Sequence, residues 1–276
     1  MLRTKVNDYM SRDVAVVLPS DTLGKARNLM LERRVRRLVV VEGGRAVGVI
    51  TATDIAKALA RRGAPWRWRD PENALVGRFM TRDPVTVGPE ESVPSAARVM
   101  AERGIGGLPV VRDSELVGIL SETDVTRFFE ENMRGVYRAR DLLSERYGIV
   151  RHDMNIKRVA RIIASGQRIV LVSGPNGKYE GMISEGELAL WVPELARKYV
   201  LIPSRVGRRV ILDSKVRTVS SIMKELRIRV TPEDDASKAA RFILEWGLPA
   251  VPVFDEERLL GVVDKKEVVR GVSRAS

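Results

Sequence analysis

The chain has 276 residues, 44% of them hydrophobic, so it can bury a sizeable core as one large domain or two ordinary ones. No apolar run approaches the roughly 18 residues that span a bilayer, and the N-terminus has no apolar signal core, so we expect a cytoplasmic protein without a membrane anchor. The absence of cysteine excludes disulfides, thiolate catalysis and cysteine-ligated zinc.

The net charge is +12 at pH 7, and 37 of the 48 basic residues are arginine, so the chain attracts polyanions such as phosphate ligands or nucleic acid. Its single histidine, His152, lies in the polar stretch RHDMN and is expected in a turn or at the surface. One imidazole cannot build a multi-histidine metal site. Abundant arginine with a single glutamine also indicates a thermostable protein.

The first predicted elements form a β-α-β-β-α unit that ends near residue 60. A short extended piece (13–19) precedes a helix whose apolar residues are spaced by three and four (21–34), and a β-branched strand follows (36–42). A turn of polar residues and glycine then leads into a second strand. That strand ends in GVITATD (48–54), where a last helix begins.

The same order of elements recurs three times along the rest of the chain. The second copy has its helix at 91–104, its next strand at 107–113 and the ending GILSETD at 118–124. The third and fourth copies are weaker and end in GMISEGE from Gly181 and GVVDKKE from Gly261. Each unit is too small to bury its own faces well, so the copies are expected to pack together.

Two sets of landmark residues keep the same intervals of 70, 63 and 80 residues. One set is the glycine that opens each ending, and the other is a residue upstream of each extended piece. The glycines are Gly48, Gly118, Gly181 and Gly261, and the upstream residues are Met10, Met80, Leu143 and Met223. Because two independent sets stay in step, we interpret the chain as four copies of one unit.

These features resemble the CBS domain, named for cystathionine β-synthase, whose copies pair into Bateman modules. The resemblance rests on the order of elements and on the ending G-h-h-[ST]-x-[ST]-D, where h is apolar, and FMTRDPVTV, GIGGLPVV and GILSETD in the second copy match closely. It covers nearly the whole chain, and four copies look like the stand-alone microbial relatives of the γ subunit of AMP-activated protein kinase. It implies an α+β fold of four β-α-β-β-α repeats paired into two Bateman modules.

The repeats predict two modules, residues 1–131 and 132–276. The expected repeats are at about 6–60, 75–131, 138–196 and 215–275. Proline and glycine interrupt the helical pattern in 61–75, while 131–143 is expected to be a charged, helix-like connector. Residues 195–217 are expected to be a basic, strand-rich insertion that lengthens the last interval.

The turn before the last helix of each repeat admits two interpretations. Thr51 with Asp54, and Ser121 with Asp124, have nearly the spacing of a capping box, in which a hydroxyl accepts from a backbone N–H and the acid reaches back. The same turn is a natural seat for phosphate, since a helix N-terminus presents free N–H groups and partial positive charge. Hydroxyls there can donate to phosphate, and the carboxylate can accept from a ribose.

The resemblance implies that the first two copies bind an adenosine ligand, either AMP, ADP or ATP, or S-adenosylmethionine as in some relatives. The acid would hold the ribose, hydroxyls and arginines would hold the phosphate, and strand and loop segments would surround the adenine. The residues implied by position are Val14, Ala15, Arg36, Arg37, Leu38, Thr51, Thr53, Asp54, Val85, Thr86, Gly107, Leu108, Pro109, Ser121, Thr123 and Asp124.

The last two copies depart from that pattern. Copy three has Gly186 where a hydroxyl would stand and Glu187 where the acid would be Asp. Copy four has Asp264 in place of the first hydroxyl and Glu267 as the acid. Because a carboxylate at position 264 would repel phosphate, nucleotide binding is expected mainly in the N-terminal module.

The favoured function is a non-enzymatic adenosine-ligand sensor that passes its state to an unidentified effector protein, either as one chain or as a homodimer. A nucleic-acid-binding protein is the alternative, supported by the net charge and by aromatic residues among arginines. The residues concerned are Trp66, Arg67, Trp68, Arg69, Arg205, Arg208 and Arg209. An enzyme is disfavoured, since no nucleophile–base pair or phosphate loop appears and GPNG at 174–177 is a hairpin turn.

Overall fold

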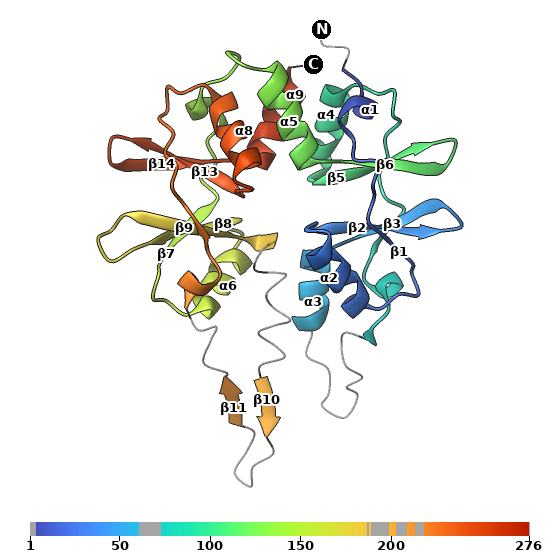
Figure 1. Ribbon diagram of the computed structural model, residues 1–276, viewed down its shortest axis with the longest axis horizontal. Helices are drawn as coiled ribbons and strands as arrows, with labels where there is room; N and C mark the ends of the chain where they lie inside the picture. The colour runs from blue at the N-terminus through green and yellow to red at the C-terminus, as the bar shows by residue number, and fades with distance from the viewer. Residues whose placement is uncertain are drawn as a thin grey trace.

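The computed structural model describes residues 4–60, 73–186, 188, 199–202, 209–212 and 218–275. Figure 1 shows two halves side by side, each with two layers of small sheets and helices, and both ends of the chain at the top. Repeats 1 and 2 form one half, and repeats 3 and 4 form the other. The expected fold class is confirmed: an α+β fold of four repeats paired into two Bateman modules.

Repeat 1 has the elements of the predicted unit. They are α1 (Val6–Tyr9), β1 (Val16–Val17), α2 (Leu23–Glu32), β2 (Arg37–Glu42), β3 (Arg45–Thr51) and α3 (Ala52–Ala60). β1 pairs parallel with β2, and β2 pairs antiparallel with β3. α2 begins where the hydroxyl of Thr22 accepts a hydrogen bond from the backbone N–H of Lys25 at 3.2 Å. The apolar side of this helix packs on the sheet, around buried Leu38 and Ile50.

Repeat 2 has the same order. Its elements are η3 (Val76–Arg78), β4 (Thr81–Arg82), α4 (Val93–Arg103), β5 (Gly107–Arg112), β6 (Glu115–Ser121) and α5 (Glu122–Asn132). The hydroxyl of Ser92 caps the start of α4, and Gly104 ends this helix in the left-handed conformation with φ 66°. A parallel bridge between Val87 and Val110 stands where repeat 1 has the β1–β2 pair.

Repeats 3 and 4 form the second half. Repeat 3 contains η4 (Ala139–Leu142), β7 (Tyr147–Arg151), α6 (Ile156–Ala164), β8 (Ile169–Ser173) and β9 (Tyr179–Ser184). Repeat 4 contains η5 (Val219–Ser221), β12 (Lys224–Glu225), α8 (Ala236–Glu245), β13 (Ala250–Asp255), β14 (Arg258–Asp264) and α9 (Lys265–Arg274). β7 pairs parallel with β8, and β8 antiparallel with β9, as in repeat 1.

Within each module, the segment that leads into one repeat pairs with the sheet of the other repeat. β4 pairs antiparallel with β3, and Ser11 is bridged to Ile119 in β6. The C-terminal module repeats this exchange, because β12 pairs with β9 and Ser144 is bridged to Val262. Neither repeat completes its sheet alone, so each module is an interlocked pair.

The two sets of landmark residues meet at these crossings. A Cβ atom added to Gly48 would lie 2.8 Å from Sδ of Met80 and 2.9 Å from the carbonyl oxygen of Thr81, closer than real Cβ contacts come. The other glycines face the other landmarks: Gly118 faces Met10, Gly181 faces Met223 and Gly261 faces Leu143. The glycines and the upstream landmarks keep the same intervals because each glycine makes room for the landmark residue that leads into its partner repeat.

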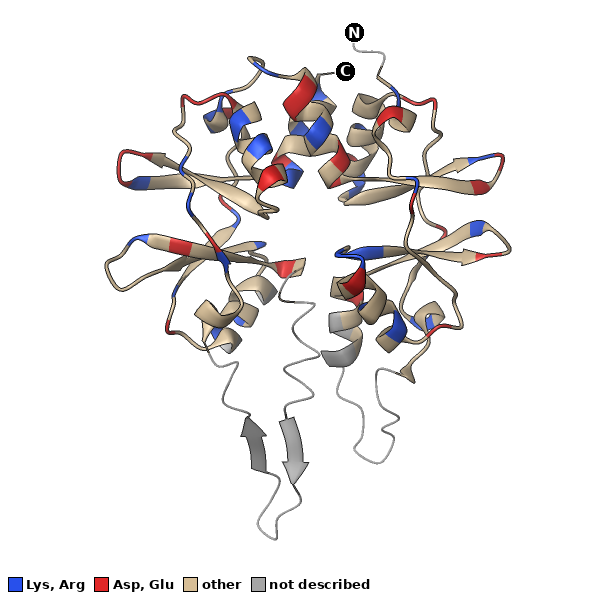
Figure 2. Cartoon of the chain, in the orientation of Figure 1, with Lys and Arg blue, Asp and Glu red and all other residues tan. Residues whose placement is uncertain are grey.

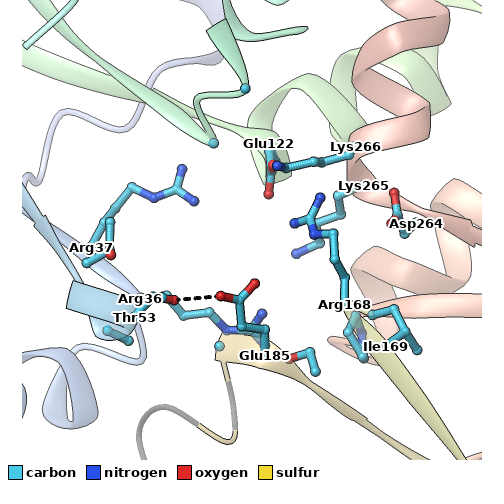
Figure 3. A pocket seen from close by; sticks show the side chains of 17 residues that line it. Arg36, Arg37, Thr53, Glu122, Arg168, Ile169, Glu185, Asp264, Lys265 and Lys266 are labelled. Carbon is cyan, nitrogen blue, oxygen red and sulfur yellow. Dashed lines mark hydrogen bonds between the residues drawn. The ribbon is translucent and has the colours of Figure 1, made fainter. Parts of the chain in front are cut away.

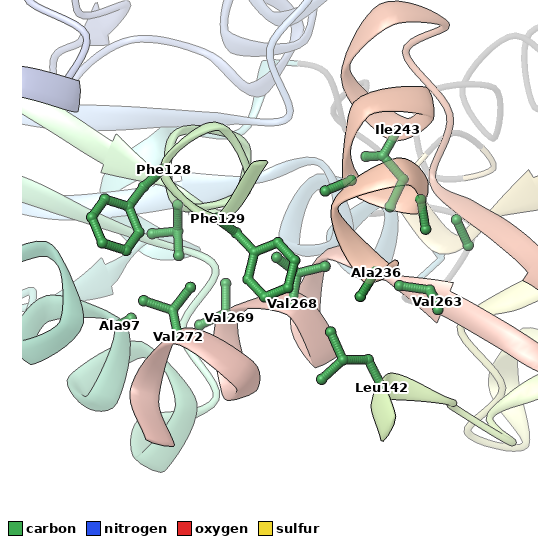
Figure 4. Close-up of a cluster of buried hydrophobic side chains, with 14 of the residues drawn as sticks. Ala97, Phe128, Phe129, Leu142, Ala236, Ile243, Val263, Val268, Val269 and Val272 are labelled. Carbon is green, nitrogen blue, oxygen red and sulfur yellow. The ribbon is translucent and has the colours of Figure 1, made fainter. Parts of the chain in front are cut away.

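The two modules join through the helices of repeats 2 and 4. α4 and α5 pack against α8 and α9, and their buried side chains form one hydrophobic cluster (Figure 4). Phe128 and Phe129 of α5 and Val272 of α9 are fully buried in it. The modules therefore stack within one chain, which the sequence left undecided. Repeats 1 and 3 have smaller cores of their own.

The connector at 131–143 corrects one expectation. α5 ends at Asn132, and a turn with Gly135 at φ 80° separates it from η4, so the segment is not one helix. Its backbone is bonded to repeat 4 instead: Gly135 N–H donates to Asp235 at 2.6 Å, and Ala139 N–H donates to the carbonyl of Asp234 at 2.8 Å. The module boundary between residues 131 and 132 stays a prediction.

Other local expectations agree with the structure. The insertion contains the antiparallel pair β10 (Tyr199–Ile202) and β11 (Arg209–Leu212), while residues 61–72 of the first linker lie outside the described residues. Gly177, with φ 77°, lies in the hairpin turn between β8 and β9, and His152 lies in the turn after β7. Among the described residues, none of the helices combines the length and the hydrophobicity that a membrane-spanning segment needs.

Replacing Gly48 with Ala should lower the free energy of unfolding by about 1–3 kcal/mol, because the added methyl group overlaps Met80 and a backbone oxygen that cannot move aside. Urea denaturation measures the change. Gly88→Ala is the matched control, since its new Cβ would meet nothing closer than 3.6 Å. Equal effects of the two substitutions would contradict this account of the crossing.

Candidate functional site

A cavity of about 250 Å³ lies where the four repeats meet, and Figure 3 shows charged side chains from both modules directed toward it. Its charged lining residues are Arg36, Arg37, Glu122, Arg168, Glu185, Asp264, Lys265 and Lys266. Five cations face three carboxylates, so the cavity carries an excess of positive charge in a confined space. Such a cavity is suited to an anion.

The cavity is lined by equivalent positions of the four repeats. The sheets fix the equivalence, because Arg37, Gly107, Ile169 and Ala250 each pair with the last residue of the following strand. The residue before this pair lines the cavity in every repeat, as Arg36, Gly106, Arg168 and Pro249. The first residue of the last helix also does so, as Ala52, Glu122, Glu185 and Lys265. The cavity is therefore a product of the repeat symmetry.

Arg37 crosses from repeat 1 to repeat 2. A Cβ atom at Gly106 would lie 2.5 Å from Nη2 of Arg37, and Gly107 is equally close to this guanidinium group. The two glycines stand where repeat 1 has Arg36 and Arg37, so their missing side chains leave the room that Arg37 occupies. Its Nη1 atom is buried and has no hydrogen-bond partner among the described residues. Burial lowers the pKa of Arg37 from its usual value, opposed by the charge of Glu122.

The side chain of Lys265 extends from repeat 4 to repeat 2. Its Nζ donates a hydrogen bond to Oγ1 of Thr123 at 2.9 Å. Burial, reinforced by the nearby positive charge of Arg36, lowers the pKa of Lys265 to about 8. The pKa of Lys266 is also lowered, mainly by burial and then by Arg168. Both lysines would be stabilised by an anion in the cavity.

Repeat 1 meets repeat 3 through a different pair. Oγ1 of Thr53 donates to Oε1 of Glu185 at 3.4 Å, the dashed contact in Figure 3. The side chain of Arg36 lies along Gly186, where a Cβ atom would approach its Cδ to 2.7 Å. Two polar contacts between the modules thus involve the second hydroxyl of the predicted motif, Thr53 in one repeat and Thr123 in the other.

Both capping boxes are formed. Oδ2 of Asp54 accepts from Thr51 N–H at 2.9 Å and from its hydroxyl at 2.6 Å. Oδ2 of Asp124 accepts from Ser121 N–H at 2.8 Å and from its hydroxyl at 2.6 Å. Asp124 is buried, and its Oδ1 lies 3.3 Å from Nη2 of Arg127. The capping interpretation is confirmed, and the acids also stand beside the cavity-lining ends of their helices.

The structure brings four of the predicted site residues to the cavity wall: Arg36, Arg37, Thr51 and Thr53. The other predicted residues lie outside this wall. Leu38 and Leu108 are fully buried in the hydrophobic cores, so only their backbone could meet a ligand. Val85 and Thr86 are exposed, whereas Val14 and Ala15, before β1, are half-buried. Gly107 and Pro109 lie in β5, and the carbonyl of Pro109 accepts from Val87 N–H at 3.1 Å.

Sequence reasoning missed the contribution of the C-terminal module, namely Arg168, Glu185, Lys265 and Lys266. For Glu185 and Lys265 the available signal was the unspecified position x of the motif, which lines the cavity in all four repeats. For Arg168 it was the alignment with Arg36 in repeat 1. Asp264 has a different role from the one expected, because its Oδ1 accepts from Glu267 N–H at 2.9 Å and caps α9.

Some predicted residues fall outside the described part of the chain. These are Trp66, Arg67, Trp68, Arg69, Glu187, Arg205 and Arg208, while Arg209 is described only as part of strand β11.

A sequence model of the CBS domain matches residues 6–61, 76–131 and 219–274, which is more than half of the chain. The chain belongs to the CBS domain family. The matched segments correspond to repeats 1, 2 and 4. Repeat 3 lies outside them, yet its strands and helix keep the order of the family unit, and its sheet has the register of repeat 1.

Two solved structures share the whole architecture. Protein MJ1225 from Methanocaldococcus jannaschii, described as a proposed archaeal homologue of the γ subunit of AMP-activated protein kinase, is 22% identical with a TM-score of 0.74. The alignment covers 97% of this chain and 99% of that one. A conserved protein from Pyrococcus horikoshii is 18% identical with a TM-score of 0.64, over 98% and 100% of the two chains. At these identities the likeness shows the fold alone.

Curated relatives match over part of their length. MJ1225 is 35% identical over 133 residues, which are 45% of this chain and 46% of that protein. An inosine-5′-monophosphate dehydrogenase from Korarchaeum cryptofilum is 36% identical over 129 residues, which are 46% of this chain and 24% of the enzyme. The chain thus spans about a quarter to a half of these relatives.

Replacing Lys265 with Gln should stabilise the ligand-free protein by roughly 1–3 kcal/mol at pH 7. The folded state lowers the pKa of this lysine from 10.5 to about 8, so its charge costs stability fully below pH 8. This cost fades as the pH rises toward 10.5, where the unfolded chain also loses the proton. Urea denaturation at pH 7 and near pH 10.5 measures the difference.

The control is Lys178→Gln, at the exposed β8–β9 hairpin, which should change the free energy of unfolding little at either pH. A Lys265→Gln variant that is no more stable than the natural chain at pH 7 would contradict the cost assigned to the buried ammonium group.

Proposed function

We propose that the chain is a non-catalytic regulatory protein that binds an adenosine nucleotide in its N-terminal module, with the phosphate in the cavity between the four repeats. The observation that carries the proposal is the guanidinium of Arg37, whose buried Nη1 atom has no hydrogen-bond partner among the described residues although Arg37 lines a cavity rich in cations. A buried N–H group without a hydrogen-bond partner costs stability, and a phosphate oxygen would offset that cost.

The helix starts supply the remaining phosphate contacts. α3 and α5 begin at the cavity, where the helix dipole favours negative charge. Thr51 and Thr53 are also part of the cavity wall. A phosphate in the cavity would meet the guanidinium of Arg37 and the positive end of a helix, a combination that suits a phosphoryl group.

The carboxylates fit the ribose. Both hydrogen bonds from Thr51 go to Oδ2 of Asp54, so Oδ1 takes no hydrogen bond from Thr51 and could accept one from a ribose hydroxyl. Asp124 has the same geometry toward Ser121, with Arg127 beside its Oδ1. The capping box therefore preforms the turn and orients the acid, so the two interpretations of the motif support one another.

The proposed regulatory action follows from the position of the cavity between the modules. A ligand in contact with residues of both modules would bias how they are held together, and an effector protein or a second copy of the chain would read that state. AMP, ADP and ATP share the adenosine and phosphate groups that this site would recognise. S-adenosylmethionine shares the adenosine alone.

Isothermal titration calorimetry with AMP tests the proposal. The natural chain should bind, and Asp54→Ala combined with Asp124→Ala should weaken binding at least tenfold, because both ribose acceptors are lost. Asp141→Ala is the matched control, since Asp141 closes a similar capping box at η4, away from the cavity. Unchanged affinity in the double variant, or no binding by the natural chain, would contradict the proposal.

The same samples address the nucleic-acid alternative. A gel-shift titration with single-stranded DNA at rising salt should show no complex that survives physiological ionic strength, because the proposed anion site is a cavity of about 250 Å³ between the repeats and not an extended surface along which a strand could lie. A tight complex that weakens steeply with salt would favour the alternative.

A further inference from the structure

The two strand-to-helix turns of the N-terminal module face opposite charges from the C-terminal module. Thr53 of repeat 1 is hydrogen-bonded to Glu185 of repeat 3, and Thr123 of repeat 2 is hydrogen-bonded to Lys265 of repeat 4. Glu185 and Lys265 occupy the same position, the first residue of the last helix of their repeats. The contacts are thus equivalent in place and opposite in sign.

The direction of the two hydrogen bonds differs as well. Thr53 donates its hydroxyl proton to the Glu185 carboxylate, so this proton is not free for a phosphate oxygen. Thr123 accepts from the Lys265 ammonium group, so its own proton remains free to donate. A phosphate at the first turn would have to displace a carboxylate, whereas at the second it would find a hydroxyl donor beside a cation.

The partner strands strengthen this difference. The guanidinium of Arg37 lies over Gly106 and Gly107, on the side of Glu122 at the start of α5. Repeat 2 places no equivalent cation beside α3, because Gly106 and Gly107 stand where repeat 1 has Arg36 and Arg37. Arg36 lies along Gly186 beside Glu185 and is already engaged in an interaction of its own. Arg37 and Lys265 therefore both stand at repeat 2, with Glu122 as the carboxylate beside them.

We infer that the C-terminal module sets the ligand charge that each N-terminal turn accepts. The turn at Ser121–Asp124 takes a phosphorylated adenosine ligand, because Lys265 and Arg37 stand against it. The turn at Thr51–Asp54 takes an adenosyl ligand without a phosphate, because Glu185 holds the place of that group. Glu185 and Lys265 are the specificity-determining residues. This inference rests on the proposed function, since it assumes that both turns bind adenosine.

Calorimetry with two probes, AMP and adenosine, tests the inference one turn at a time. In the Asp54→Ala variant the measured binding is that of the turn of repeat 2, and AMP should bind at least tenfold more tightly than adenosine. In the Asp124→Ala variant the measured binding is that of the turn of repeat 1, and adenosine should bind at least as tightly as AMP. The same preference for AMP at both turns would overturn the inference while leaving the proposed function intact.

Charge-neutralising variants identify the residues responsible. Glu185→Gln in the Asp124→Ala background should raise the affinity for AMP at least fivefold relative to adenosine, since the amide keeps the size of the side chain and removes its charge. Lys265→Gln in the Asp54→Ala background should lower the affinity for AMP about tenfold more than that for adenosine. If neither variant changes the ratio of the affinities for AMP and adenosine, the inference is overturned.

The matched controls are Glu115→Gln and Lys178→Gln, exposed residues at hairpins away from the cavity, which should leave both ratios unchanged. Circular dichroism confirms that each variant is folded before titration. If neither AMP nor adenosine binds the natural chain, the proposed function fails and the inference fails with it.

Discussion

The fold depends on one contact made in every repeat, where a residue ahead of one repeat packs against a glycine in the sheet of its partner. At Gly48 a side chain and a backbone oxygen both lie within 3 Å of the place a Cβ would take, so only glycine fits. This contact carries each leading segment across to the other sheet and ties the repeats into pairs. The hydrophobic seam between α5 and α9 then joins the pairs, and four helix starts converge on one cavity.

The charged side chains that line the cavity lower the stability of the ligand-free protein. Arg37 has a buried nitrogen without a partner among the described residues, and burial depresses the pKa of Lys265. Replacing buried charges with apolar groups of similar size often stabilises a protein, so their presence indicates a function that uses the charge. The capping boxes at Asp54 and Asp124 have the opposite effect, because they hold both turns in shape without a ligand.

The motifs of the C-terminal module depart from those of the first two repeats. In the folded chain its departures have specific places: Asp264 caps α9, Lys265 reaches Thr123, and Glu185 accepts from Thr53. A repeat that loses its own ligand residues can still supply charges to a shared cavity. The two modules therefore build the cavity together, and the C-terminal module contributes charges to it as the N-terminal module does.

The four repeats, their order of elements and the turns at Thr51 and Ser121 could be predicted from the sequence, because hydrophobic periodicity and landmark spacing are local or periodic properties. The resemblance to the CBS domain implied the α+β fold. The sequence also supplied the arginines at 36 and 37. The folded chain was needed to show that the modules stack within one chain, that Arg37 lies over Gly106, and that Glu185 and Lys265 contact different threonines. These facts join residues more than 60 positions apart in the chain, and such pairs come together only when helices and sheets pack.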